Sequence, residues 1–255
     1  MKQPREPRPD WYRTAFDEIY PVLYAHRTQK EAVDFIARLS DRLDLGGGRV
    51  LDLGCGTGRY LRAISDRGLC PIGLDLSLPL LEITRSRLPQ VPLVRADMRR
   101  LPIRDRSFRG VLLMFTTFGY FHTREEDVSV LREVARVIDA DGRFVFDYVN
   151  ARHVREHLVY RSGRLIREMC AEERRWIDPE GPFLCKETRL GPMRDGTYRT
   201  YRERLRLYEP PQIEEMIEDA GFRITERLGD YHAAPFDPAR SPRLLLLTVR
   251  GEGAR

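Results

Sequence analysis

The stretch Val50-Leu51-Asp52-Leu53-Gly54-Cys55-Gly56-Thr57-Gly58-Arg59 decides the fold of this 255-residue chain. Its apolar start predicts a short buried strand. Its three glycines at alternate positions predict a tight turn, and residues 60–64 predict the start of a helix. A strand, a turn and a helix form a crevice at the carboxyl end of an open α/β sheet, where such folds bind ligands. Glycine suits this turn because a side chain would hold a ligand away from the backbone.

A second strand that ends in an acidic residue supports a nucleotide-like ligand. Residues 71–77 are an apolar run that ends near Asp75. This acid follows the glycine turn by about 20 residues, where doubly wound folds place a carboxylate that accepts hydrogen bonds from ribose hydroxyls. The turn itself departs from the G-x-G-x-x-G dinucleotide pattern, and Asp52 lies two residues before its first glycine. A carboxylate there would repel a pyrophosphate but could hold an ammonium group.

These residues resemble the first motif of the class I S-adenosylmethionine-dependent methyltransferases, an acid followed by G-x-G-x-G. Other phrases over roughly residues 11–250 look like a bacterial group of small-molecule methyltransferases. They read YPVLYAHR, LDLGCGTGR, GLDLS, ADMRRLP, FTTFGYF, LREVARV, DYVN and RLRLYEPPQIEEMIEDAGF. One departure is Thr116-Thr117, where Thr-Ser is expected, and it keeps a hydroxyl in place. The resemblance implies an α/β, Rossmann-like seven-stranded sheet, mostly parallel with an antiparallel last strand.

The resemblance also implies S-adenosylmethionine as the cofactor and S-adenosylhomocysteine as its product. It places Asp97 near the adenine amino group and Met98 against the adenine ring. A leading helix often covers the cofactor in this class, and from there Arg27 could meet the carboxylate of the methionine part. The expected cofactor-binding residues are Tyr24, Arg27, Asp52, Gly54, Gly56, Asp75, Leu76, Asp97, Met98 and Phe115.

The remaining pattern predicts a methyltransferase core over residues 10–151 and 209–255, preceded by a loose, proline-rich tail at residues 1–9. Asp10 could begin a helix that Pro21 interrupts, and helical spacing recurs at residues 30–39. Further core elements are expected as strands at 91–98, 110–115, 143–150, 222–228 and 243–249, and as helices at 78–88, 124–137 and from Pro210 to the closing Gly221. The last two strands should form the antiparallel pair that closes the sheet.

Residues 152–208 do not follow the alternation of strands and helices. Asp195-Gly196 is a strong hairpin signal between residues 183–193 and 197–208, and the turn at 178–182 follows another predicted strand at 165–177. We therefore expect a small antiparallel sheet inserted after the fifth strand. Its position predicts a lid over the rim of the main sheet that carries part of the acceptor site.

An aromatic run at the carboxyl end of the fourth strand is a candidate wall between cofactor and acceptor. The predicted acceptor-binding residues are Thr117, Phe118, Tyr120, Tyr148, Asn150, Tyr208 and Asp230. An amine acceptor needs only to arrive unprotonated, whereas a phenol would need a base. The candidate catalytic residues are Tyr120, Tyr148 and His232, with His122 as a further possibility.

Composition narrows the class of protein. The net charge is +5 and the isoelectric point near 9.1, but the arginines are spread along the chain beside acids, so nucleic acid is not favoured as a partner. The four cysteines form no C-x-x-C pair, which argues against a zinc site, and no apolar run is long enough for a membrane helix. We expect a cytoplasmic monomer or homodimer.

The predicted function is methyl transfer from S-adenosylmethionine to a nitrogen or oxygen of a small molecule, by in-line displacement under a lid. Two alternatives stay open. The basic composition is compatible with a methyltransferase that acts on nucleic acid or protein, although the chain has no Asn-Pro-Pro-Tyr or Asp-Pro-Pro-Tyr tetrapeptide after the fourth strand. The other alternative is a scaffold that binds the cofactor without catalysis.

Overall fold

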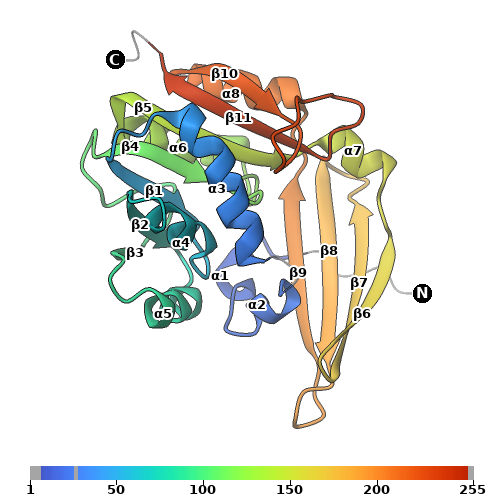
Figure 1. Ribbon diagram of the computed structural model, residues 1–255. Coiled ribbons are helices and arrows are strands. Elements are labelled where there is room, and N and C mark those ends of the chain that lie inside the picture. Colours follow the sequence, from blue (N-terminus) through green and yellow to red (C-terminus); the bar gives the residue numbers. More distant parts are fainter. Residues whose placement is uncertain (1–6, 26–27, 252–255) are drawn as a thin grey trace.

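A computed structural model describes residues 7–25 and 28–251, and its centre is a seven-stranded sheet in the order β10-β11-β5-β4-β1-β2-β3 (Figure 1). The neighbouring strands from β5 to β3 run parallel, and β11 is antiparallel to both β5 and β10. The strands are β1 (Arg49–Leu53), β2 (Cys70–Asp75), β3 (Leu93–Arg95), β4 (Phe108–Leu113), β5 (Ile138–Val149), β10 (Phe222–Leu228) and β11 (Arg243–Arg250). The predicted Rossmann-like sheet with an antiparallel last strand is confirmed.

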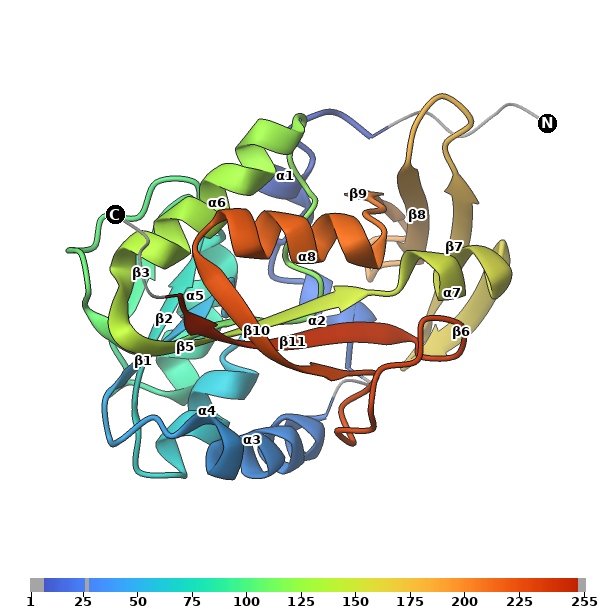
Figure 2. The ribbon, with the colours of Figure 1, turned by 90° about the horizontal axis from the view of Figure 1, so that it is seen from above.

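Helices cover both faces of this sheet, with α3 and α4 on one face and α6 and α8 on the other (Figure 2). The core helices are α3 (Gln29–Leu43), α4 (Arg59–Ser65), α5 (Leu78–Arg87), α6 (Arg124–Val137) and α8 (Pro210–Asp219). Their starts follow from local sequence, because Thr28, Ser77 and Thr123 each accept a hydrogen bond from a backbone N–H in the first turn. Buried apolar side chains fill both interfaces, so the sheet is covered on both faces as its parallel strands require.

The inserted segment forms a separate four-stranded antiparallel sheet, which we call the lid sheet. It consists of β6 (Arg161–Ile166), β7 (Met169–Ile177), β8 (Phe183–Gly191) and β9 (Arg199–Arg206), and the short helix α7 (Ala151–Glu156) leads into it. The strand expected over residues 165–177 is wrong in one respect. A turn at Arg167-Glu168 divides this stretch, since Arg167 has a left-handed φ of 56° and the chain reverses there.

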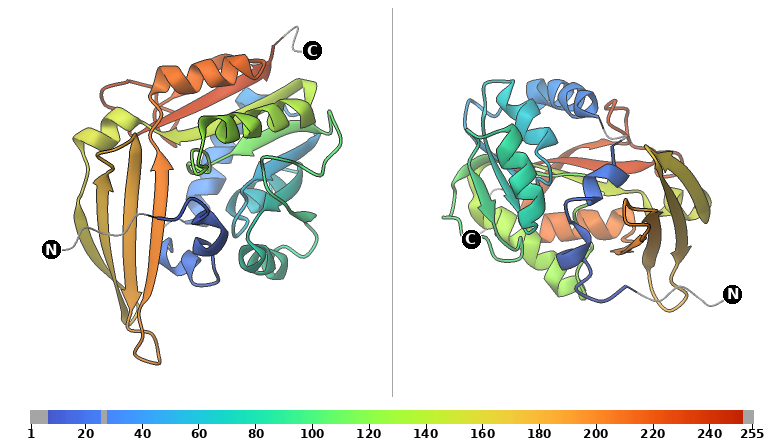
Figure 3. Two further views of the ribbon diagram at one scale, coloured as in Figure 1. Left: turned by 180° about the vertical axis from the view of Figure 1, so that it is seen from behind. Right: turned by 90° about the horizontal axis from the view of Figure 1, so that it is seen from below.

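Two short helices, α1 (Tyr12–Ala15) and α2 (Tyr20–Leu23), lie between the lid sheet and the core (Figure 3). We call residues 10–25 the cap segment. Its first helix is not capped by Asp10, and Pro21 does not interrupt a helix but occupies the first turn of α2, where its missing N–H is harmless. Of the predicted tail, residues 1–6 lie outside the described residues.

The cap segment is fastened to the lid sheet by both apolar and polar contacts. Leu23 is buried against Ala171, Leu190 and Tyr201 of the lid sheet, and the Tyr201 hydroxyl lies 3.1 Å from both carboxylate oxygens of Asp17. Cap and lid therefore approach the rim of the main sheet as neighbours.

Among the described helices, none combines the length and apolar character needed to cross a bilayer.

Candidate functional site

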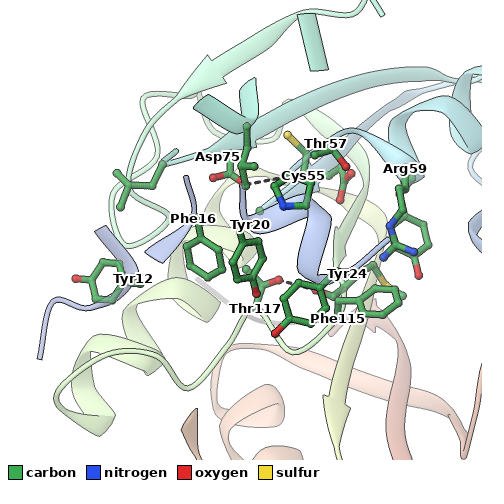
Figure 4. A pocket seen from close by; sticks show the side chains of 18 of the residues that line it. Tyr12, Phe16, Tyr20, Tyr24, Cys55, Thr57, Arg59, Asp75, Phe115 and Thr117 are labelled. Atoms are coloured by element: carbon green, nitrogen blue, oxygen red, sulfur yellow. Dashed lines mark hydrogen bonds between the residues drawn. The ribbon is translucent and has the colours of Figure 1, made fainter. Parts of the chain in front are cut away.

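A cavity of about 590 Å³ lies between the carboxyl ends of β1, β2 and β4, the cap segment and the turn between β6 and β7. This volume falls within the range of small-molecule sites. The core contributes the glycine turn and the ends of the strands, the cap contributes a row of aromatic side chains, and the lid sheet contributes Ile166 and Arg167. Figure 4 shows Phe16, Tyr20 and Tyr24 on one side of the cavity, with Asp75, Cys55 and Thr57 above them in this view.

The glycine turn is shaped by backbone angles and by the wall opposite it. Gly54, Gly56 and Gly58 have φ values of 77°, 52° and 79°, which residues with side chains rarely adopt. A Cβ on Gly54 would lie 2.4 Å from Cγ2 of Thr117, so this glycine is also required by the close packing of the loop after β4. The turn and that loop thus form two adjoining walls of the cavity.

Asp75, at the end of β2, supports the glycine turn from below. One of its carboxylate oxygens accepts the Gly56 N–H at 2.8 Å, and the other accepts the Ser77 N–H at 2.8 Å. Burial raises the pKa of Asp75, and these backbone N–H groups partly oppose that effect. Each carboxylate oxygen keeps a second lone pair, so Asp75 can also accept hydrogen bonds from a diol in the cavity.

Asp97 lies farther along the same wall and is paired with Arg99. The guanidinium group of Arg99 contacts both carboxylate oxygens, at 3.0 Å and 2.7 Å. Burial tends to raise the pKa of Asp97, but the hydrogen bonds from Arg99 outweigh burial and the pKa is lowered. Asp97 is therefore a firmly ionised acceptor beside Met98, which also lines the cavity.

Asp52 carries the clearest signal of a bound cation. Its side chain is 2% exposed and lines the cavity, and its Oδ2 atom has no hydrogen-bond partner. Burial, and next the charge of Asp75, raise the pKa of Asp52 to about 7 despite the nearby Arg59. Because buried polar atoms are normally paired, an unpaired carboxylate oxygen that faces a cavity indicates a ligand with a donor, such as an ammonium group.

Sequence reasoning missed two neighbours of Asp52. Arg59 follows the glycine turn directly, lines the cavity and has a buried Nη1 atom without a hydrogen-bond partner, although Glu31 lies 3.5 Å away. Tyr60 also lines the cavity, and its buried hydroxyl has no partner. Their position at the start of α4 could have predicted that they bind an anion, because the first turn of a helix attracts anions. Together they can receive a carboxylate beside the ammonium site.

The cavity brings together most of the residues expected to bind the cofactor. Its lining includes Tyr24, Asp52, Gly54, Gly56, Asp75, Leu76, Asp97, Met98 and Phe115. The proposed carboxylate ligand Arg27 lies outside the described residues. The lining also includes two residues expected to bind the acceptor, Thr117 and Tyr120. Tyr120 packs edge-on against Trp11 of the cap segment at 4.9 Å, so cap and core meet at this end of the cavity.

Three aromatic residues that we expected at the acceptor are instead core residues. Phe118 and Tyr148 are fully buried, and their rings pack edge to face. The Tyr148 hydroxyl donates to the carbonyl of Arg206, and burial raises its pKa well above the ordinary value, so it is no base at the cavity. Tyr208 donates its hydroxyl to Asp127 at 2.8 Å. The physical reason is strand alternation, because Tyr148 faces the α6 side of β5 while Asp147 faces the opposite side.

Three further acceptor and catalytic predictions are also corrected. Asn150 is fully buried, caps α7, and donates its amide to the carbonyls of Pro238 and Ser241 at 3.0 and 2.8 Å. Asp230 accepts the backbone N–H of His232 at 2.8 Å and so shapes its own loop. His232 is exposed, and neither residue is among those that line the cavity. The secondary candidate His122 is exposed as well.

The catalytic role predicted for Tyr120 stays open, since this is the one catalytic candidate in the cavity lining. Among the described residues, no group of three or more His, Cys, Asp or Glu side chains is arranged to hold a metal ion. The described site combines the buried carboxyl group of Asp52, the neighbouring guanidinium of Arg59 and hydroxyl of Tyr60, and aromatic walls. It can hold a zwitterion attached to a nucleoside-like group.

Comparison with known sequences agrees with this site. A family model described as a methyltransferase domain matches residues 50–142, which contain the glycine turn, Asp75 and Asp97. The dTDP-3-amino-3,4,6-trideoxy-alpha-D-glucopyranose N,N-dimethyltransferase of Streptomyces venezuelae is 31% identical over 142 residues, 53% of this chain and 58% of that protein. A demethylmenaquinone methyltransferase of Renibacterium salmoninarum is 30% identical over 148 residues, 54% and 58% of the two chains. The matched region spans about half the length of these relatives.

Solved structures match nearly the whole fold, lid sheet included. The CcbJ methyltransferase from Streptomyces caelestis superposes with a TM-score of 0.78 and 22% identity, covering 94% of this chain and 99% of that one. CalS10, an amino pentose methyltransferase from Micromonospora echinaspora, was solved with S-adenosylmethionine bound. It superposes with a TM-score of 0.70 and 24% identity, covering 91% of this chain and 96% of that one. Residues 50–142 thus match a methyltransferase domain, and the chain as a whole shares the fold of solved methyltransferases, one of them with S-adenosylmethionine bound.

Proposed function

We propose that this protein binds S-adenosylmethionine in the cavity and transfers its methyl group to a nitrogen of a small, amine-bearing acceptor such as an amino sugar. The observation that carries the proposal is the unpartnered Oδ2 atom of Asp52, buried in the wall that the glycine turn creates. The ammonium group of the cofactor's methionine part would supply a positively charged donor to this atom, and a dinucleotide carries no ammonium group.

The other cavity residues fit the rest of the cofactor. The Arg59 guanidinium and the Tyr60 hydroxyl, both with unpartnered buried atoms, would receive the methionine carboxylate. Asp75 would accept the ribose hydroxyls through its remaining lone pairs, and Asp97 with Met98 would contact the adenine. Each of these groups already lines the cavity.

The bound cofactor supplies a methyl group on a positively charged sulfur, and the thioether that departs is neutral and needs no acid. The chain's own contribution is alignment and exclusion of water, which can supply effective molarities of roughly 10⁵ M or more. The cap segment would provide both, since Phe16, Tyr20 and Tyr24 line the cavity and their rings pack edge-on or tilted, with successive centroids 4.7 Å apart. Aromatic faces of this kind also favour a cationic centre.

An amine acceptor has two lines of support. Two curated relatives are N,N-dimethyltransferases of dTDP-linked amino sugars, and one of the similar structures, KedS8 from Streptoalloteichus, is a sugar N-methyltransferase. The cavity of about 590 Å³, lined by residues of the cap and the lid, suits a compact molecule better than a polymer. An amine that arrives unprotonated attacks the methyl carbon with its own lone pair as the carbon–sulfur bond breaks, and the resulting ammonium product later releases its proton to water.

Calorimetry and a transfer assay test the proposal. The chain should bind S-adenosylhomocysteine and show no heat with NAD. With S-adenosylmethionine and dTDP-3-amino-3,6-dideoxy-alpha-D-glucopyranose as the probe amine, mass spectrometry should detect a methylated sugar. Absence of S-adenosylhomocysteine binding would overturn the whole proposal. Binding together with methylation of bulk tRNA, but of no probe amine, would overturn the acceptor and favour a polymer substrate.

A further inference from the structure

Two consecutive residues at the edge of the cavity have an unusual backbone conformation. Phe115 and Thr116 follow β4 with φ values of 58° and 59°. Bulky and β-branched residues rarely enter this left-handed region, and within the described ranges no other two adjacent non-glycine residues do so. These angles also explain why the strand expected to reach residue 115 ends at Leu113. Strain of this kind persists only where surrounding groups hold it in place.

The groups that hold it belong to a buried network centred on Asp147 at the end of β5. One carboxylate oxygen accepts the Phe115 N–H at 2.7 Å and the Tyr231 hydroxyl at 2.5 Å, and the other accepts Nε of Arg243 at 2.6 Å. Arg243 also donates from Nη2 to the Thr116 hydroxyl at 2.8 Å. The Thr116 N–H donates to the Asp147 carbonyl at 3.2 Å. Both strained residues are therefore tied to β5 and β11.

The same network sets the position of the Phe115 ring. Tyr231 stacks on this ring with centroids 5.2 Å apart and planes 27° apart. The guanidinium carbon of Arg59 lies 4.2 Å from the Phe115 ring centroid. Phe115 and Arg59 line the cavity. The network residues Asp147, Tyr231 and Arg243 are not among the lining residues, so they act on the cavity through the residues they contact. Burial, and next the Asp147 carboxylate, raise the pKa of Tyr231 well above its usual range, so the hydroxyl stays a donor.

We propose that Asp147, Tyr231 and Arg243 are positioning residues that hold Phe115 and Thr116 in the strained conformation and so fix the wall against which the cofactor binds. The inference rests on the proposed cofactor site. Its consequence is energetic, because a wall that occupies the left-handed conformer only part of the time weakens cofactor binding in proportion to that fraction. Thr117, the next residue, packs on Gly54, so displacement of this wall reaches the glycine turn directly.

The variant Tyr231→Phe tests this inference because it keeps the ring stacked on Phe115 and removes one hydrogen bond to Asp147. The matched control is Thr248→Val, which removes a buried 3.1 Å hydrogen bond to the Phe144 carbonyl at the opposite end of β11. Titration with S-adenosylhomocysteine should give a dissociation constant raised about tenfold in Tyr231→Phe. Thr248→Val should bind as the wild type does, although both variants melt at a lower temperature.

A second variant separates loss of positioning from a general folding defect. Thr116→Val keeps the branched shape and removes the hydroxyl that Arg243 contacts, and it should weaken S-adenosylhomocysteine binding in the same direction. If the wild type binds and both Tyr231→Phe and Thr116→Val bind as tightly as Thr248→Val, the positioning role is overturned while the cofactor site stands. If the wild type itself does not bind S-adenosylhomocysteine, the proposed function fails first, so the two failures are distinguishable.

Discussion

At the scale of single residues, the most informative group is Asp52. Its burial and the neighbouring Asp75 charge raise its pKa to about 7, which makes the ionised form costly until a cation arrives. Its ionised form therefore lowers the stability of the ligand-free protein, and in the proposed function an ammonium group would offset this cost. This is the physical pattern expected where function, not folding, determines a side chain.

Asp52→Asn should stabilise the ligand-free protein and weaken cofactor binding. The folded pKa lies above the unfolded value of 3.8, so the folded state holds more protons between about pH 4 and pH 7, and the wild type loses stability as the pH rises through that range. Thermal melts should therefore show a Tm advantage of the variant that grows from pH 4 to 7 and then levels off. Each kcal/mol gained corresponds to roughly 2–4 °C. An advantage that is the same at every pH would contradict the assignment of this pKa.

At the scale of elements, polar contacts join the lid sheet to the core. The backbone N–H of Arg206, the last residue of β9, donates to the Gly119 carbonyl at 2.8 Å, and its guanidinium donates to the His122 carbonyl at 2.6 Å. Two residues later, Tyr208 bonds Asp127 in the first turn of α6. The root of β9 is therefore fixed to the loop that carries Tyr120.

Tyr208→Phe should loosen this joint without damaging the cofactor site. Removing the hydroxyl leaves the fully buried Asp127 without its 2.8 Å donor, which should cost roughly 1–3 kcal/mol of unfolding free energy. Urea denaturation measures this loss. S-adenosylhomocysteine affinity should stay near that of the wild type, because Tyr208 and Asp127 are not among the cavity-lining residues. An equal loss of affinity would show that the joint and the cofactor site are coupled.

At the scale of the whole molecule, a bound ligand should join core, cap and lid, since all three line one cavity. S-adenosylhomocysteine at about 100 times its dissociation constant should raise the unfolding free energy by about 2.7 kcal/mol. Because the departing thioether needs no Lewis acid, neither this stabilisation nor methyl transfer should change when EDTA is added. Activity that disappears with EDTA and returns with magnesium would contradict this and indicate a metal-assisted acceptor site.

The sequence by itself, with the resemblance it carries, predicted the fold and most of the core residues that line the cavity. The glycine turn, Asp52, Asp75 and Asp97 are local features, because each lies at or just after the end of its own strand, and parallel strands bring such ends to one edge of a sheet. Turn residues likewise predicted the inserted sheet, and the family resemblance predicted the closing antiparallel pair. These features depend on near neighbours in the chain.

Only the tertiary structure decided which of the residues predicted at the acceptor line the cavity. Tyr148 and Asp147 are adjacent, yet β5 turns one toward the buried core beneath α6 and the other toward Tyr231 and Arg243, which are 84 and 96 residues away. A one-residue shift in the register of β5 would exchange their faces, and polarity alone does not fix that register. The Asn150 side-chain amide likewise donates to the carbonyls of Pro238 and Ser241, about 90 residues away. Such pairings join segments distant in sequence, so no local pattern could reveal which side chains reach the cavity.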